Sequence, residues 1–192
     1  MSTPELFTPE GLRARGMVVP DVRFRKEIDL FVETDARGAP QTGGILFVGD
    51  SDFTRWRSGN LFEECFQGMQ ALNRGFGGAR TWETLIYFRE MVEPPRPETI
   101  VYNAGDNDLF AGPEVTPEKV GLGFELFLEA VKTRLPETRR LLYMAIHRAP
   151  SREDDRRRQD EANRLLAGLC ADSPLAEFVD YNFLLYDSEG EL

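Results

Sequence analysis

Histidine and cysteine are scarce in this chain of 192 residues. It contains one histidine, His147, and two cysteines, Cys65 and Cys170. The cysteines stand far apart, in neither a CxxC nor a metal-ligand spacing, so the sequence predicts no disulfide framework. We likewise expect no metal site, because the histidine and the cysteines do not form a ligand cluster.

Positive charge is also in deficit. The chain has 33 acidic and 23 basic side chains, which gives a formal net charge of −10, and it has no basic block. Binding to nucleic acid or to an anionic membrane surface rests on clustered lysine and arginine. We therefore expect no nucleic-acid partner.

Long apolar runs are missing too. No stretch approaches the length of a membrane span, and the N-terminus lacks a basic region followed by an apolar run. These features predict a soluble, cytoplasmic protein without a signal peptide. The hydrophobic content of 41% suffices for the core of one domain. We expect an N-terminal arm and leading helix over residues 1–40 and a domain over residues 41–192.

The chain does show a regular alternation of short apolar runs and helical patterns. Residues 1–20 lack periodicity and are interpreted as a loose arm, whereas a helical pattern begins at Asp21 with Phe24, Ile28 and Phe31. Strands are expected at 45–48, 99–102, 141–146 and 178–181, and residues 68–72 lead into a further short strand that ends at Asn73. Helices are expected at 81–92, 116–135 and 151–170, residues 54–68 are mixed with the pattern of a short helix, and a turn is expected at 187–190. This alternation predicts an α/β fold, a three-layer α/β/α sandwich around a flavodoxin-like parallel sheet of order 2-1-3-4-5.

Ser51 follows the first expected strand directly. Ile45 to Val48 is an apolar run that ends in Gly49-Asp50-Ser51. Ligands of such sheets bind at the carboxyl ends of the strands, so Ser51 is a candidate nucleophile. Serine and aspartate are also frequent helix N-caps, and this stretch by itself favours the N-cap interpretation.

Two further loops favour the interpretation of Ser51 as a nucleophile over that as a helix N-cap. The second strand ends in Asn73-Arg74-Gly75-Phe76-Gly77-Gly78 and the third in Gly105-Asp106-Asn107-Asp108. In a sheet of order 2-1-3 the three loops converge at one edge. Taken together, and in this order, they resemble the first three motif blocks of the SGNH (GDSL-type) hydrolases, over roughly residues 41–192.

This resemblance implies the roles of three residues. Ser51 matches the nucleophilic serine, Gly78 the glycine whose backbone N–H binds the oxyanion, and Asn107 the asparagine whose side-chain N–H does the same. Acyl transfer builds negative charge on a carbonyl oxygen, and pre-placed N–H donors stabilise that charge. The resemblance is to the lysophospholipase-like and platelet-activating-factor-acetylhydrolase-like branch. It implies a small-molecule acyl ester as substrate and no cofactor.

Other motif assignments fit less well. Residues 75–80 begin like a dinucleotide fingerprint, but Arg80 occupies the third glycine position and the stretch follows the second strand. Residues 49–53 are not a Gly-x-Ser-x-Gly elbow, because Phe53 occupies its last position. Neither a Walker A pattern nor a metal-ligand cluster is found in the sequence.

The chain departs from the family pattern in its last part. Family members carry an Asp-x-x-His block after the fifth strand, whose histidine is the general base. Here the only histidine, His147, has Met144 three residues before it, and it is interpreted as a partly exposed loop histidine further from Ser51.

Without a base, serine is a weak nucleophile, so a poor or inactive esterase is expected. The alternative is an inactive, truncated member or a binding remnant. We also expect the final helix to be lacking, which would leave an apolar patch that favours association.

Overall fold

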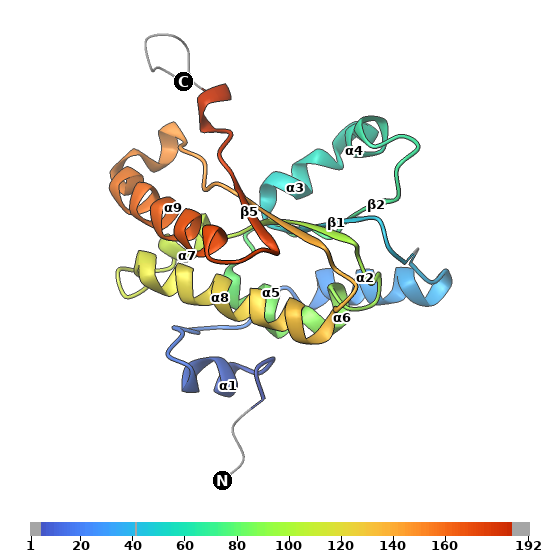
Figure 1. Ribbon diagram of the computed structural model, residues 1–192, viewed down its shortest axis with the longest axis horizontal. Coiled ribbons are helices and arrows are strands. Elements are labelled where there is room, and N and C mark those ends of the chain that lie inside the picture. Colours follow the sequence, from blue (N-terminus) through green and yellow to red (C-terminus); the bar gives the residue numbers. More distant parts are fainter. Residues whose placement is uncertain (1–4, 41, 186–192) are drawn as a thin grey trace.

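A single sheet of five parallel strands runs through the centre of the chain (Figure 1). The structure is a computed structural model, and it describes residues 5–40 and 42–185. The strand order is β2-β1-β3-β4-β5, which confirms the expected fold class. The strands are β1 (Ile45–Gly49), β2 (Ala71–Asn73), β3 (Thr99–Asn103), β4 (Arg140–Met144) and β5 (Ala176–Val179).

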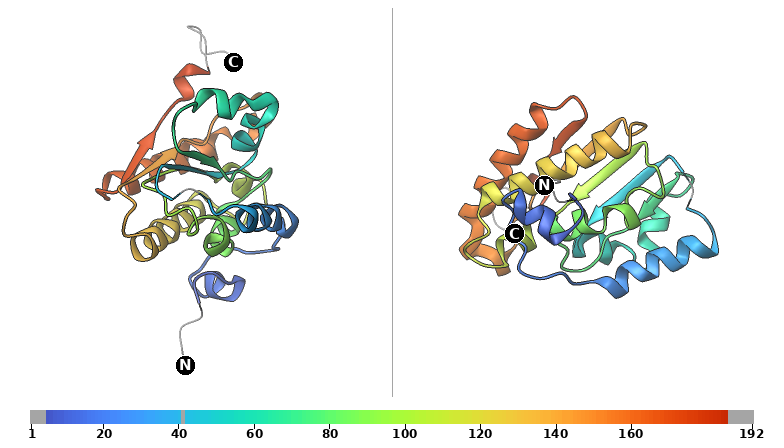
Figure 2. Two further views of the ribbon diagram at one scale, coloured as in Figure 1. Left: turned by 90° about the vertical axis from the view of Figure 1, so that its right-hand side faces the viewer. Right: turned by 90° about the horizontal axis from the view of Figure 1, so that it is seen from below.

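Helices cover both faces of this sheet (Figures 1 and 2). One face carries α3 (Ser51–Trp56) and α4 (Leu61–Cys65), which connect β1 to β2. The other face carries the connections that follow β2, β3 and β4, and α8 packs there between α5 and α9. Its helices are α5 (Thr81–Ile86), α6 (Phe88–Met91), α8 (Pro117–Arg134) and α9 (Arg156–Ala171), with α7 (Asp106–Leu109) in the loop after β3.

The two faces of β1 contribute to two separate cores. Leu46 and Val48 belong to the large cluster under α5, α8 and α9, whereas Phe47 belongs to a small cluster under α3 and α4. The Phe47 ring packs edge-on against Phe53 and Phe62, with ring centroids 5.3 and 5.1 Å apart. Burial on both faces explains why this parallel strand is apolar throughout.

The described part of the N-terminal region is more ordered than expected, and the interpretation as a loose arm is wrong for residues 5–20. They include α1 (Pro9–Ala14), and the side chains of Leu12, Met17 and Val19 are buried in the large cluster. The helix expected from Asp21 is α2 (Arg25–Arg37), which begins only after Phe24 in a left-handed conformation (φ +69°).

Several expected helices are divided in the structure. The helix at 54–68 is broken by η1 (Ser58–Asn60), where Gly59 and Asn60 have positive φ. The helix at 151–170 starts as η2 (Pro150–Asp155), and η3 (Asn182–Leu184) follows β5. The fifth strand lies at 176–179 rather than 178–181. The turn expected at 187–190 and the question of a final helix lie outside the described residues.

An apolar hollow lies on the α3 face of the sheet. It is lined by side chains that include Phe53, Trp56, Met144 and Leu184. Leu184 and its neighbour Phe183 are each 71% exposed. Apolar surface of the expected kind is therefore present on this face, and association through it stays a prediction.

Candidate active site

Ser51 is the first residue of α3, immediately beyond the carboxyl end of β1. The N-cap of this helix is Asp50, whose Oδ1 accepts a hydrogen bond of 3.0 Å from the N–H of Asp52. Within the described part of the chain, neither the hydroxyl nor the backbone N–H of Ser51 makes a hydrogen bond. The N-cap role thus falls to Asp50, and both polar groups of Ser51 are left for other partners.

Close backbone approach at the end of β1 explains its glycine. A Cβ atom at Gly49 would lie 2.1 Å from the backbone oxygen of Asn103 on the neighbouring strand β3. Any larger residue would push these strands apart. The absence of a side chain at Gly49 therefore allows the loops after β1 and β3 to meet.

Gly78 lies in a tight turn after β2. The N–H of Ala79 donates to the carbonyl of Phe76 over 3.1 Å, and Gly78 between them has φ +82°. A positive φ at this position is the signature of a type II turn and favours glycine. The N–H of Gly78 has no hydrogen-bond partner among the residues that the structure describes. It is consequently available as a donor.

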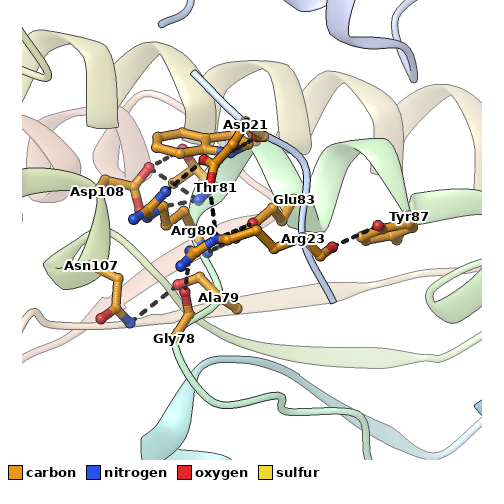
Figure 3. Close-up of polar contacts among 11 residues, drawn as sticks. Asp21, Arg23, Gly78, Ala79, Arg80, Thr81, Glu83, Tyr87, Asn107 and Asp108 are labelled. Atoms are coloured by element: carbon orange, nitrogen blue, oxygen red, sulfur yellow. Dashed lines mark hydrogen bonds and ion pairs between the residues drawn. The ribbon is translucent and has the colours of Figure 1, made fainter. Parts of the chain in front are cut away.

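Asn107 connects the three loops. Its Nδ2 atom donates to Oδ2 of Asp50 over 3.0 Å. The same atom donates to the carbonyl oxygen of Ala79 over 3.2 Å (Figure 3). Asp50 precedes Ser51, and Ala79 follows Gly78. The structure therefore brings together the loops of the three residues that the sequence singles out. In this arrangement both hydrogens of the Asn107 amide are engaged, so binding an oxyanion requires one of them to change partner.

Asp108 connects the loop after β3 to Thr81 at the start of α5. Its side chain is buried and accepts hydrogen bonds from the Thr81 backbone N–H at 3.0 Å and from the Thr81 hydroxyl. Burial raises the pKa of Asp108 to about 6, against the opposing effect of these hydrogen bonds. The contact ties the loop after β3 to the start of α5. The sequence identified Asp108 only as the last residue of its motif and did not indicate that it holds the start of α5.

Asp50 is the second buried carboxyl group of the site. Burial raises its pKa to about 7, and the nearby charge of Asp52 adds to the effect. Near neutral pH the group is thus divided between the carboxyl and the carboxylate form. Its hydrogen bonds to α3 and to Asn107 link the position of Ser51 to that of Asn107.

His147 lies closer to the site than the sequence suggested. It is a partly exposed loop residue after β4, as expected, but its Nδ1 atom lies 3.0 Å from Oδ2 of Asp52, the neighbour of Ser51. The hydrogen bond to Asp52 raises the pKa of His147, while partial burial opposes this shift. Among the described residues, no hydrogen bond joins His147 to Ser51. The partly exposed loop position of His147 is as expected, and its ion pair with Asp52 is a contact that the sequence did not indicate.

Sequence comparison with known proteins shows similarity to acetylhydrolase subunits. No family model matches the chain. It is 29% identical over 123 residues to the platelet-activating factor acetylhydrolase IB subunit alpha2 of Homo sapiens, across 64% of this chain. The chain spans 52% of that relative's length.

Solved structures show the same fold. A Streptococcus pneumonia structure named as a platelet activating factor superposes with a TM-score of 0.73 at 21% identity, over 87% of this chain and 78% of that one. A GDSL-like lipase from Bacteroides thetaiotaomicron gives a TM-score of 0.66 at 20% identity, over 85% and 82%. The resemblance to the SGNH hydrolases, with their acylhydrolases and GDSL-type esterases, is confirmed.

Among the helices of the described residues, none is long and apolar enough to cross a membrane. Within the same residues, no group of three or more histidine, cysteine or acidic side chains is placed to hold a metal ion. The candidate site consists of Ser51, Gly78 and Asn107 and of the groups that hold them.

Proposed function

We propose that this chain carries the site of a serine ester hydrolase, in which the Ser51 hydroxyl attacks the carbonyl carbon of an acyl ester. The alcohol leaves, and an acyl-enzyme on Ser51 is then hydrolysed by water. The backbone N–H groups of Ser51 and Gly78 and the amide of Asn107 stabilise the oxyanion of each tetrahedral intermediate. The substrate is a small-molecule ester.

One observation carries this proposal. The Asn107 amide nitrogen lies within 3.0 Å of Asp50 and 3.2 Å of Ala79, which are the direct neighbours of Ser51 and Gly78. These two hydrogen bonds support the proposal that a nucleophile and two oxyanion donors, from three separate loops, act on the same carbonyl group of the substrate. The N–H groups of Ser51 and Gly78 have no hydrogen-bond partner among the described residues, which supports the same role.

Turnover also requires a base, and the chain offers His147. Its Nδ1 atom is held by Asp52, which leaves Nε2 as the nitrogen that can accept a proton from Ser51. Since no hydrogen bond joins the two side chains in the structure, we expect slow turnover. In this proposal His147 is the general base.

Hydrolysis of short p-nitrophenyl esters tests the proposal. We expect Ser51→Ala to remove turnover above the buffer rate, and His147→Ala to reduce it to the residual level that an oxyanion site supports without a base. If turnover is lost in Ser51→Ala but not in His147→Ala, Ser51 is the nucleophile and His147 is not the base. Turnover that is unchanged by Ser51→Ala would reject the hydrolase site.

A further inference from the structure

Residues 21–24 cross the outer side of the turn that contains Gly78. We call them the 21–24 segment. The backbone oxygen of Asp21 accepts a hydrogen bond of 3.2 Å from Trp82 Nε1, and the backbone oxygen of Arg23 accepts one of 2.6 Å from the Tyr87 hydroxyl. Both donors belong to the helical stretch that follows the turn. The segment is thus fixed to the protein by its own backbone, as Figure 3 shows.

The Arg23 side chain connects this segment to the turn. Its Nη2 atom donates to the carbonyl oxygen of Gly78 over 3.2 Å, and its Nε atom lies 3.2 Å from Oε1 of Glu83 (Figure 3). The second carboxylate oxygen of Glu83 accepts a hydrogen bond of 3.1 Å from the N–H of Arg80. The Glu83 side chain is fully buried, so it provides Arg23 with a fixed partner.

Phe24 closes the same side of the turn. A Cβ atom at Gly78 would lie 3.3 Å from Cζ of Phe24, and the Phe24 ring also packs edge-on against Phe76, with centroids 5.3 Å apart. Phe24 adopts this position in a left-handed conformation, which is costly for an aromatic residue. Its contacts with the turn stabilise that conformation.

The orientation of the Gly78 N–H depends on the conformation of this turn. Type I and type II turns differ by a flip of their central peptide, which here joins Gly77 to Gly78 and contains that N–H. Arg23 holds the Gly78 carbonyl from one side, and Asn107 holds the Ala79 carbonyl through its own amide. Two successive carbonyl groups are therefore fixed by separate side chains, and this restricts rotation about the backbone bonds of Gly78.

We propose that Arg23 is a positioning residue, which holds the Gly78 carbonyl so that the neighbouring N–H stays directed at the developing oxyanion. This inference rests on the proposed hydrolase function and adds a residue from outside the three motif loops. Arginine suits the task, because its planar fork presents several N–H groups in fixed directions. A lysine offers one ammonium group and cannot reproduce the paired contact with Gly78 and Glu83.

The test compares Arg23→Met with Arg25→Met. Arg25 lies two residues further on, is half-exposed and pairs with Glu90 and Asp29. Its guanidinium also lies over the Tyr87 ring, but none of its hydrogen bonds in the described part of the chain reaches the turn. We expect Arg23→Met to lower kcat for a p-nitrophenyl ester by about 10- to 100-fold with KM changed less than about threefold, since misplaced groups affect the transition state most. Arg25→Met should change neither value, and Arg23→Lys should restore only part of the loss.

A second readout does not depend on turnover. Hydrogen exchange of the Ala79 amide, followed by NMR, reports opening of the turn, and we expect it to accelerate at least severalfold in Arg23→Met and not in Arg25→Met. Absence of Ser51-dependent turnover in the unmodified protein would reject the hydrolase function. The exchange rate of the Ala79 amide would still show whether Arg23 holds the turn. Equal exchange rates and equal kcat in the two variants would overturn the proposal.

A third variant separates positioning from folding. Arg23→Met removes the guanidinium that pairs with the buried Glu83 carboxylate, and loss of that partner lowers the stability of the fold by itself. The double variant Arg23→Met/Glu83→Gln removes this unpaired charge and keeps an acceptor for the Arg80 N–H. We expect it to fold and to show the same fall in kcat, and an unchanged kcat in the double variant would contradict the role of Arg23.

Discussion

The Nδ1 atom of His147 lies 3.0 Å from Oδ2 of Asp52, so a loop after β4 contacts the helix that begins with Ser51. This ion pair joins the only histidine of the chain to the neighbour of the proposed nucleophile. It also gives the proposed base a carboxylate partner, as serine hydrolases require.

The first prediction concerns the pH dependence of ester hydrolysis. A base acts only when it is neutral, and the hydrogen bond to Asp52 raises the pKa of His147 above its ordinary value of 6.5. We expect kcat/KM to rise with pH through this raised pKa. Asp52→Asn removes the negative charge that favours the imidazolium, so the rising limb should move to lower pH. A limb at the same pH in both proteins would exclude His147 as the base.

The second prediction uses two adjacent glycines. Gly78→Ala places a side chain at φ +82° and near Phe24, whereas a Cβ at Gly77 would meet no atom within 4 Å. The strain at Gly78 is of the order of 1–3 kcal/mol, and a displaced oxyanion donor lowers kcat by about 10²–10³-fold. We expect Gly77→Ala to remain close to the unmodified protein in both stability and kcat. Equal losses in the two variants would show that Gly78 has no particular role.

The third prediction concerns Asn107. Asn107→Ala removes an oxyanion donor and also the hydrogen bonds to Asp50 and Ala79. We expect kcat to fall by about 10²–10³-fold and the melting temperature to drop by a few degrees, since each neutral hydrogen bond contributes about 1 kcal/mol. Thr138→Ala is a suitable control, because its buried hydroxyl donates to the backbone oxygen of Pro97 at the amino ends of β3 and β4, the opposite end of the strands. A fall in kcat of the same size in Thr138→Ala would point to a general loss of stability.

The fourth prediction is a change of stability with pH. Burial raises the pKa of Glu83 from 4.5 to about 7, despite the opposing charge of Arg23. The folded protein therefore binds this proton more tightly than the unfolded chain does. The stabilisation from the raised pKa is fully present below pH 4.5 and is lost as the pH rises to about 7, by at most about 3 kcal/mol.

Glu83→Gln provides the measurement. Urea unfolding between pH 4.5 and 8 should show a smaller loss of stability in the variant than in the unmodified protein. Asp50 and Asp108 also have raised pKa values, so part of the pH dependence of the unfolding free energy should remain in both proteins. Identical curves for the two proteins would contradict the raised pKa of Glu83.

The sequence was sufficient for the sheet and for the loops at its edge. Apolar runs such as Ile45 to Val48 identify buried strands, and their spacing along the chain fixes the parallel order. Ser51, Gly78 and Asn107 lie in the segments that follow β1, β2 and β3, so the expected topology was enough to bring their loops together.

Contacts between distant side chains could not be predicted in the same way. The pairing of His147 with Asp52 depends on the path of a loop after β4, and no local pattern encodes that path. The helical pattern from Asp21 likewise suggested a continuous helix. Residues 21–24 are instead non-helical, because Trp82 and Tyr87 donate to their backbone and Phe24 packs on the turn of Gly78.

The 21–24 segment has a consequence for where this domain can be divided. A shortened protein that starts at Gly43 would keep all five strands and the loops of Ser51, Gly78 and Asn107. It would nevertheless lose Arg23 and Phe24, together with the buried Leu12, Met17 and Val19. We expect such a protein to expose Glu83 and the Gly78 carbonyl to water, so the smallest unit that preserves the site begins well before the first strand.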